Sequence, residues 1–168
     1  DMPYGQEGRA AVVYQVVDET QTPWALKVFK PQYRVPALVQ SSQQMALYAE
    51  LPGLQVCRRT ILTATSHRTL LRQYPDLVYA VLMPWIEGPT WAEVFMTRTE
   101  LSPEQSLTLA QSLAGILTMM EERGLAHCDL SGSNLIIPYL AVDKLAAMPN
   151  VALVDVEQLY AARLQRPQ

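Results

Sequence analysis

The chain has 168 residues, enough for one domain or two small lobes, and its composition of 49% apolar and 17% charged residues is that of a soluble globular protein. Its net charge of -3, without any basic block, gives no reason to expect nucleic-acid binding. The longest apolar run, 77–86, is too short to span a bilayer.

The first part of the chain predicts two strands around Lys27. Residues 12–17 are rich in β-branched side chains, and residues 24–29 form a second apolar run after the polar turn 18–23, so a hairpin is expected. A glycine-bearing turn precedes the first strand; such a turn can present backbone N–H groups to a phosphate, although most are only turns. Lys27 lies inside the second strand, where it either points to solvent or needs a partner.

A helix and two further strands are predicted next. The helix covers 38–51 and ends at Pro52-Gly53, and the strands cover 54–65 and 77–84. His67 lies in the polar connection between these strands and is interpreted as a surface residue. The Pro- and Gly-rich segment 83–89 is typical of a hinge, so we expect two domains, 1–86 and 87–168.

The second domain is predicted to be mainly helical. A short helix is expected over 90–96, and Ser102, Pro103 and Gln105 together predict a capped start for a longer one. Gly124 ends this longer helix. Its predicted apolar face consists of Leu107, Ala110, Leu113, Leu117 and Met120.

An Asp and an Asn lie five residues apart on a polar turn that follows the long helix. Asp129 and Asn134 precede a hydrophobic run, and their spacing can aim a carboxylate at a substrate hydroxyl and an amide oxygen at a metal ion. Such a site also needs a cation for phosphates and a second metal ligand.

The order of these features resembles the protein-kinase-like superfamily over nearly the whole chain. His127-Cys128-Asp129 is similar to the His-Arg-Asp motif, and Asp155-Val156-Glu157 stands where Asp-Phe-Gly is expected. An Asp-x-Glu variant is more similar to bacterial and small-molecule kinases, such as the aminoglycoside phosphotransferases. The resemblance implies an α+β, bilobal fold: a small antiparallel sheet with one helix in the first lobe, and a partial, mainly helical second lobe.

The resemblance also implies a site for ATP and Mg²⁺. Lys27 would pair with the α and β phosphates, and Asp129 would accept the proton of the acceptor hydroxyl. Asn134 and Asp155 would hold Mg²⁺ through oxygen atoms, and Glu157 would either add another oxygen or stay solvated.

The nucleotide's remaining contacts are implied in the first lobe and the hinge. Gly8 would belong to the loop that covers the phosphates, and Met83 would be the gatekeeper. The Pro84 carbonyl would accept a hydrogen bond from the adenine amino group, and the Ile86 N–H would serve a ring nitrogen.

The sequence departs from the kinase pattern at several positions. Gln6 and Ala11 stand where the phosphate-covering loop would carry glycine, and no glutamate lies at 42–44 to pair with Lys27. Cys128 replaces the arginine that would contact a phosphorylated activation segment, so we expect no activation of that kind. Ser131 replaces a lysine typical of protein kinases.

Two functions are therefore open. The first is an ATP-dependent phosphotransferase that moves the γ-phosphoryl group to a hydroxyl of a protein or a small molecule. The second is a pseudokinase-like nucleotide-binding or scaffolding module without catalysis. Four residues that match the kinase pattern favour the first function: Lys27, Asp129, Asn134 and Asp155. The degenerate glycine loop favours the second.

The cellular setting is also predicted from the sequence. Cys57 and Cys128 form no CxxC or Cys/His metal pattern, so we interpret them as reduced thiols of a cytoplasmic protein. The chain opens at Asp1 without an initiator Met and ends soon after Asp155, so we expect it to be part of a larger, multidomain protein.

Overall fold

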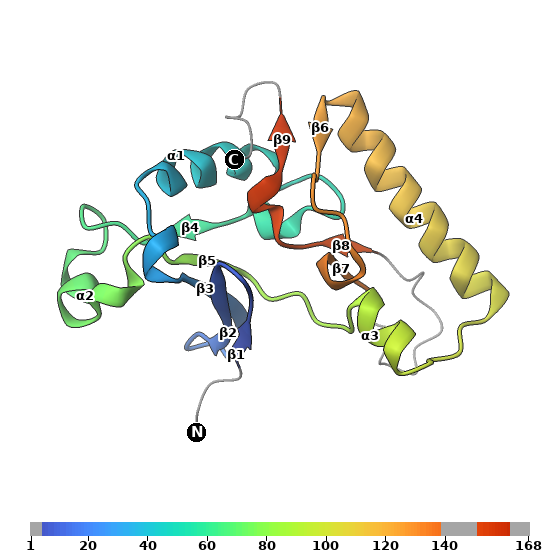
Figure 1. Cartoon of the computed structure of the whole chain (residues 1–168), viewed down its shortest axis with the longest axis horizontal. Helices are drawn as coiled ribbons and strands as arrows, with labels where there is room; N and C mark the ends of the chain where they lie inside the picture. Colours follow the sequence, from blue (N-terminus) through green and yellow to red (C-terminus); the bar gives the residue numbers. More distant parts are fainter. Residues whose placement is uncertain (1–4, 139–150, 162–168) are drawn as a thin grey trace. The chain divides into compact units, whose positions relative to one another are not determined.

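The computed structural model describes residues 5–138 and 151–161. These residues form an α+β fold with a five-stranded antiparallel sheet and a few helices (Figure 1). They divide into two compact units: the first joins the described residues up to Ala49 with Val56–Trp85, and the second joins Glu50–Gln55 with the described residues from Ile86 onward. The predicted boundary at 86/87 therefore lies one residue beyond this division. Within the described residues, no helix is both long and apolar enough to cross a membrane.

The sheet of the first unit has the strand order β1-β2-β3-β5-β4, and all neighbours are antiparallel. Its strands are β1 Gly5–Glu7, β2 Ala11–Val17, β3 Pro23–Phe29, β4 Thr60–Ile61 and β5 Val81–Pro84. The predicted hairpin is confirmed, with Val13 opposite Lys27. The sequence analysis missed β1, a short strand whose three residues are all exposed.

One face of the sheet is more buried than the other. Along β3, burial alternates, with Ala25, Lys27 and Phe29 buried between half-buried neighbours. Residues opposite each other in antiparallel strands share a face, so Val81, opposite Lys27, lies on this side too. The Lys27 side chain is only 7% exposed, which rules out the interpretation that it simply points to solvent.

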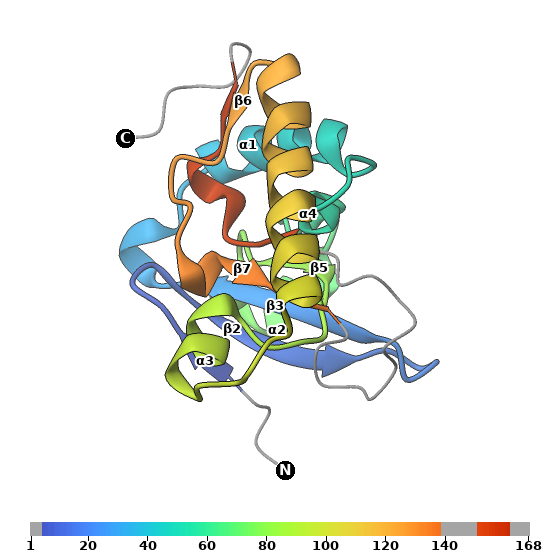
Figure 2. The same cartoon turned by 90° about the vertical axis from the view of Figure 1, so that its right-hand side faces the viewer.

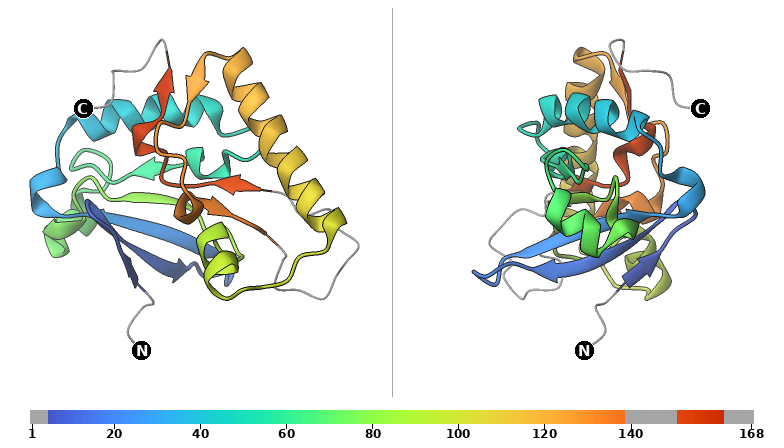
Figure 3. Two further views of the ribbon diagram at one scale, coloured as in Figure 1. Left: turned by 45° about the vertical axis from the view of Figure 1, so that its right-hand side comes forward. Right: turned by 90° about the vertical axis from the view of Figure 1, so that its left-hand side faces the viewer.

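The helical segments of the first unit are short. The α-helices are α1 Ala37–Met45 and α2 Arg68–Gln73, and the 3₁₀ turns are η1 Pro31–Tyr33, η2 Ala46–Tyr48 and η4 Pro75–Leu77; η3 Gln55–Cys57 spans the division between the units. Figure 3 shows α1 over one face of the sheet, where it packs near β4. The predicted helix over 38–51 is correct in place but ends early, because its last turn tightens to 3₁₀ geometry at Ala46.

The predicted strand over 54–65 is wrong for most of its length. Only Thr60–Ile61 pairs with another strand. Leu54, Val56 and Cys57 are buried in and beside a 3₁₀ turn, and a short run buried on every side gives the same sequence pattern as a buried strand. His67 is half-buried and occupies the N-cap position of α2 without a side-chain capping hydrogen bond; the sequence analysis placed this helix in a loop.

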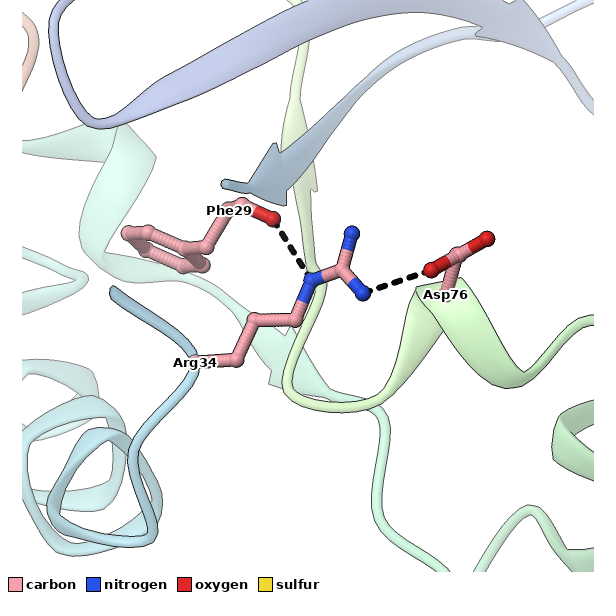
Figure 4. Close-up of polar contacts among 3 residues, drawn as sticks. All are labelled: Phe29, Arg34 and Asp76. Carbon is pink, nitrogen blue, oxygen red and sulfur yellow. Dashed lines mark hydrogen bonds and ion pairs between the residues drawn. The ribbon is translucent and has the colours of Figure 1, made fainter. Parts of the chain in front are cut away.

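Arg34 joins two distant segments of the first unit. Its Nε donates a 2.7 Å hydrogen bond to the Phe29 carbonyl, at the end of β3, and its Nη1 lies 2.7 Å from Oδ1 of Asp76 in η4 (Figure 4). The Arg34 side chain is 17% exposed and that of Asp76 is 81% exposed. Because exposed ion pairs contribute little, the bond to the Phe29 carbonyl is the better anchor.

Asp18 organises the turn between β2 and β3. Its Oδ1 accepts hydrogen bonds from the N–H groups of Thr20 at 2.8 Å and Thr22 at 3.0 Å, and its Oδ2 accepts one from the Trp24 indole at 3.0 Å. The Thr20 hydroxyl also donates to Oδ1. The side-chain bonds from Thr20 and Trp24 are the main causes that lower the pKa of Asp18 from 3.8 to about 2.

Acid should therefore remove the stabilisation that Asp18 provides. Its pKa is lower in the folded chain than in the unfolded one, so this stabilisation is present above about pH 4 and is lost as the pH falls toward 2. We expect the parent to be more stable than Asp18→Asn at neutral pH, with the difference shrinking between about pH 4 and pH 2. Thermal unfolding followed by tryptophan fluorescence measures it. A difference that stays constant with pH would contradict this role.

The second unit contains two capped helices and two small strand pairs (Figure 2). Its elements are α3 Trp91–Met96, α4 Pro103–Glu122, β6 Leu125–Ala126, η5 Gly132–Asn134, β7 Leu135–Ile136, β8 Ala152–Leu153, η6 Val156–Gln158 and β9 Tyr160–Ala161. β6 pairs with β9, and β7 pairs with β8. Both predicted helices are confirmed. Ser102 and Gln105 form the predicted capping box, and Gly124 follows α4 with a positive φ of 66°.

The buried face of α4 differs from the predicted one at its N-terminal end. Leu109, Ile116 and Met120 are buried, whereas Leu107 is 59% exposed and Ala110 is exposed as well. The buried side chains recur at the spacing of one helical face from Leu109 onward, whereas the predicted face began at Leu107.

Candidate functional site

Asp129 and Asn134 lie on one turn of the second unit and contact each other. The turn runs from β6 to β7, and Asp129 is exposed whereas Asn134 is buried. The Asn134 Nδ2 donates hydrogen bonds to the Asp129 carbonyl at 2.9 Å and to its Oδ2 at 3.2 Å. The amide of Asn134 therefore fixes both the backbone and the carboxylate of Asp129.

The segment before Asp155 is bound to the same turn. β7 and β8 are antiparallel, and beyond their last pair the Val154 N–H donates to the Asn134 carbonyl at 2.9 Å. The Val154 carbonyl lies 2.9 Å from His127 Nε2; because a carbonyl only accepts, this ring nitrogen carries the hydrogen. The turn that carries Asp129 and Asn134 and the residue that precedes Asp155 come from two separate parts of the sequence and thus meet in one region of the second unit.

His127 is an anchor whose contact the sequence analysis did not predict. It is 3% exposed, and its Nδ1 has no hydrogen-bond partner among the described residues. Its place in the motif is visible in the sequence, but the bond to the Val154 carbonyl joins residues 27 positions apart, which no local pattern indicates. The bond fixes the peptide group that precedes Asp155.

Asp155 has a backbone conformation that few side chains adopt. Its φ of 57° and ψ of 50° are left-handed, and Asp is one of the few non-glycine residues that tolerate this region. The residue is exposed, and η6 begins directly after it. Glu157, in η6, is half-buried.

The turn offers oxygen atoms that suit a hard cation. Because the Asn134 amide nitrogen binds Asp129, its Oδ1 is the side-chain atom suited to a metal, together with the Asp155 carboxylate. No group of three or more His, Cys, Asp or Glu side chains among the described residues could hold a metal ion. Mg²⁺ is compatible with a smaller protein set, because it usually keeps waters and binds one or two carboxylates with substrate phosphates. The role of Glu157 stays a prediction.

The other predicted site residues belong to the first unit. Lys27 is buried in β3, with its Nζ 5.7 Å from the centre of the Phe29 ring. Met83 is buried in β5, and Pro84 ends that strand. Gly8 lies in the turn between β1 and β2, where its N–H donates to the Ala11 carbonyl at 2.8 Å. This N–H already has a partner within the turn.

The predicted nucleotide site draws on both units. The first holds Gly8, Lys27, Met83 and Pro84, and the second holds Ile86, Asp129, Asn134, Asp155 and Glu157. Residues are brought together inside each unit, and the pairing of the two sets stays a prediction. Comparison of the chain with known protein families finds no match, and comparison with curated proteins also finds none.

Proposed function

We propose that the chain is an ATP-dependent phosphotransferase with a protein-kinase-like site. The observation that carries the proposal is the double role of Asn134, whose side chain holds Asp129 while its carbonyl holds the residue before Asp155. A carboxylate for a hydroxyl and oxygen ligands for a cation are the groups that phosphoryl transfer requires from a protein. Their support by buried partners keeps them in place for such a reaction.

The proposed reaction assigns one task to each residue. The acceptor oxygen bonds to the γ-phosphorus, the bond from that phosphorus to ADP breaks, and the acceptor proton passes to Asp129. Asn134 and Asp155 would hold Mg²⁺, with Glu157 as a further candidate ligand; the bound ion neutralises charge on the phosphates. Lys27 would pair with the α and β phosphates, and its burial in β3 supports a role other than a surface charge.

A nucleotide-binding module without catalysis is the second candidate. The Gly8 turn favours this candidate. The Gly8 N–H already donates a hydrogen bond to the Ala11 carbonyl, and Gln6 and Ala11 place side chains where the kinase loop would carry glycine. A weaker hold on the phosphates is compatible with binding alone. Both candidates require that the chain bind ATP, and they differ in whether Asp129 takes part in a reaction.

Mg-ATP should raise the melting temperature of the chain. A ligand that binds only the folded state at 100 times its Kd stabilises that state by about 2.7 kcal/mol. We expect a smaller shift for Asp155→Asn and an unchanged shift for Glu100→Gln, an exposed glutamate in the same unit that no proposed contact uses. Differential scanning fluorimetry with ATP, alone and with Mg²⁺, measures these shifts. A melting temperature unaffected by millimolar Mg-ATP would argue against both candidates.

A further inference from the structure

A pocket of about 560 Å³ lies within the first unit, between α1 and the segment that runs from β4 to α2; we call it the α1–β4 pocket. α1 packs near β4, and Figure 1 shows one above the other. The helix lines the pocket through Val39, Ser42 and Ala46, which recur at the spacing of one helical face. The volume suits a small molecule, because ligand pockets usually measure about 300–1,000 Å³.

The pocket holds a buried hydroxyl group that no protein group binds. Ser42 is only 5% exposed, and its hydroxyl forms no hydrogen bond with any described residue. Among the described residues, His127 Nδ1 is the one unpartnered side-chain atom that is sealed from solvent, so the Ser42 oxygen is open to the pocket that it lines. A buried polar group costs free energy unless it is hydrogen-bonded, which suits this hydroxyl to a ligand.

The turn between β4 and α2 adds a second donor in a fixed position. The Thr63 N–H donates to His67 Nδ1 at 3.4 Å, and the His67 N–H donates to the Thr63 carbonyl at 2.8 Å. The Ser66 N–H donates to the Thr63 hydroxyl at 3.3 Å. Because Nδ1 accepts, the neutral ring carries its hydrogen on Nε2, which has no partner among the described residues. A turn that its own bonds hold loses little entropy when it binds a ligand.

The charges of the lining favour an anionic ligand. Arg59 lines the pocket, and its Nε donates to the Val56 carbonyl at 3.1 Å, which holds the guanidinium in place. His67 is a second lining side chain that can carry positive charge. No Asp or Glu of the described residues lines the pocket. A cation would therefore find no carboxylate in the lining, whereas a phosphate or carboxylate group would meet N–H and O–H donors and no like charge.

We propose that the α1–β4 pocket binds a small molecule through an anionic oxygen group, either a phosphate ester or a carboxylate. Ser42 and His67 donate hydrogen bonds to the anionic oxygens, and Arg59 adds positive charge at the pocket wall. Val39 and Ile61, which also line the pocket, contact the rest of the ligand. No residue predicted to bind nucleotide lines this pocket, so the inference does not rest on the proposed phosphotransferase function.

The test is calorimetric titration of the full chain with inorganic phosphate, phenyl phosphate and citrate at constant ionic strength, with glucose as the neutral control. We expect at least one anion to bind at millimolar concentration, and glucose not to bind. Ser42→Ala should weaken this binding about fivefold, the effect of one lost hydrogen bond. His67→Asn should weaken it too, because the amide oxygen can replace Nδ1 as the acceptor for Thr63 while the Nε2 donor is lost. Ser41→Ala, at the neighbouring position that does not line the pocket, should keep the parent's Kd.

A second readout separates a binding role of Ser42 from a structural one. The melting temperature of the free chain should stay the same or rise in Ser42→Ala, because no hydrogen bond is lost and alanine is the better helix former. A lower melting temperature would assign the hydroxyl to the fold and contradict the inference.

The remaining outcomes also decide. Binding of citrate alone or of the phosphates alone would support the inference and identify the anionic group. No anion binding at millimolar concentration, or equal binding of glucose, would overturn it. Anion binding that neither Ser42→Ala nor His67→Asn weakens would overturn it as adventitious binding elsewhere on the chain. Asp155→Asn should leave anion binding unchanged, so a failure of Mg-ATP to bind would count against the proposed function alone.

Discussion

Gly88→Ala should destabilise the second unit by about 2–6 kcal/mol. Gly88 has a φ of 135°, a conformation that side-chain-bearing residues rarely adopt, and forcing one into such a region costs about 1–3 kcal/mol. An added Cβ would also collide with the Ile137 carbonyl oxygen and lie 2.9 Å from its carbon and 3.1 Å from the Pro138 Cα. All of these are backbone atoms, so relief requires the chain to move, at about 1–3 kcal/mol more.

The damage should reach the candidate site. The Ile137 N–H donates to the Pro89 carbonyl at 2.9 Å, and Thr90 forms an antiparallel bridge with Ile136. These contacts fix the strand that follows Asn134 directly. A backbone shift at Gly88 is therefore passed to β7 and to the turn that holds Asp129.

Gly115→Ala is the matched control, and it should raise the free energy of unfolding where Gly88→Ala lowers it. Gly115 lies in α4, and apart from its chain neighbours and the nearby backbone of that helix, no atom of the described residues is within 4 Å of the position that its Cβ would take. Glycine inside a helix is less favourable than alanine by about 0.5–1 kcal/mol, so this variant should gain roughly that amount. Urea unfolding of the three proteins measures both effects. Equal stability of Gly88→Ala and the parent would contradict the close approach of Gly88 to Ile137.

The parts of the fold that local patterns determine were predicted well. The β2–β3 hairpin follows from a β-branched run and an apolar run on either side of a polar turn, and the start of α4 follows from Ser102, Pro103 and Gln105. Local patterns failed where burial comes from distant segments. Leu54 is fully buried without belonging to a strand. The sequence around it does not distinguish such a position from one inside a buried strand. Leu107 fits the spacing of an apolar helix face, but its side chain is mostly exposed to solvent.

The candidate site shows the same limit. The spacing of Asp129 and Asn134 predicted that both belong to one site, but it did not predict the hydrogen bond from the Asn134 amide to the Asp129 carboxylate. The bonds of Val154 to Asn134 and His127 depend on the pairing of β7 with β8, whose register is set by long-range packing. The burial of Lys27 was likewise undecided, because alternation along a strand says which residues share a face but not which face is covered.

Asp129→Asn should abolish phosphoryl transfer while leaving the fold in place. A side chain that accepts a proton in the transition state contributes about 10²–10⁴-fold to the rate, and an amide cannot take that role. The amide oxygen of the variant can still accept the hydrogen bond from Asn134 Nδ2, and the shorter bond to the Asp129 carbonyl does not involve the changed group. Thermal stability and the shift caused by Mg-ATP should therefore stay close to those of the parent.

The measurement is transfer of labelled phosphate from ATP to the chain itself, to water or to a serine peptide. If the proposed function is correct, the parent transfers label and Asp129→Asn falls by about 10²-fold or more, while Glu100→Gln matches the parent. A parent that binds Mg-ATP but transfers no label would identify a nucleotide-binding module instead. A variant that still transfers at the parent's rate would show that the reaction does not use this carboxylate. Because fold and nucleotide binding are followed in the same proteins, a lost reaction is not confused with a lost structure.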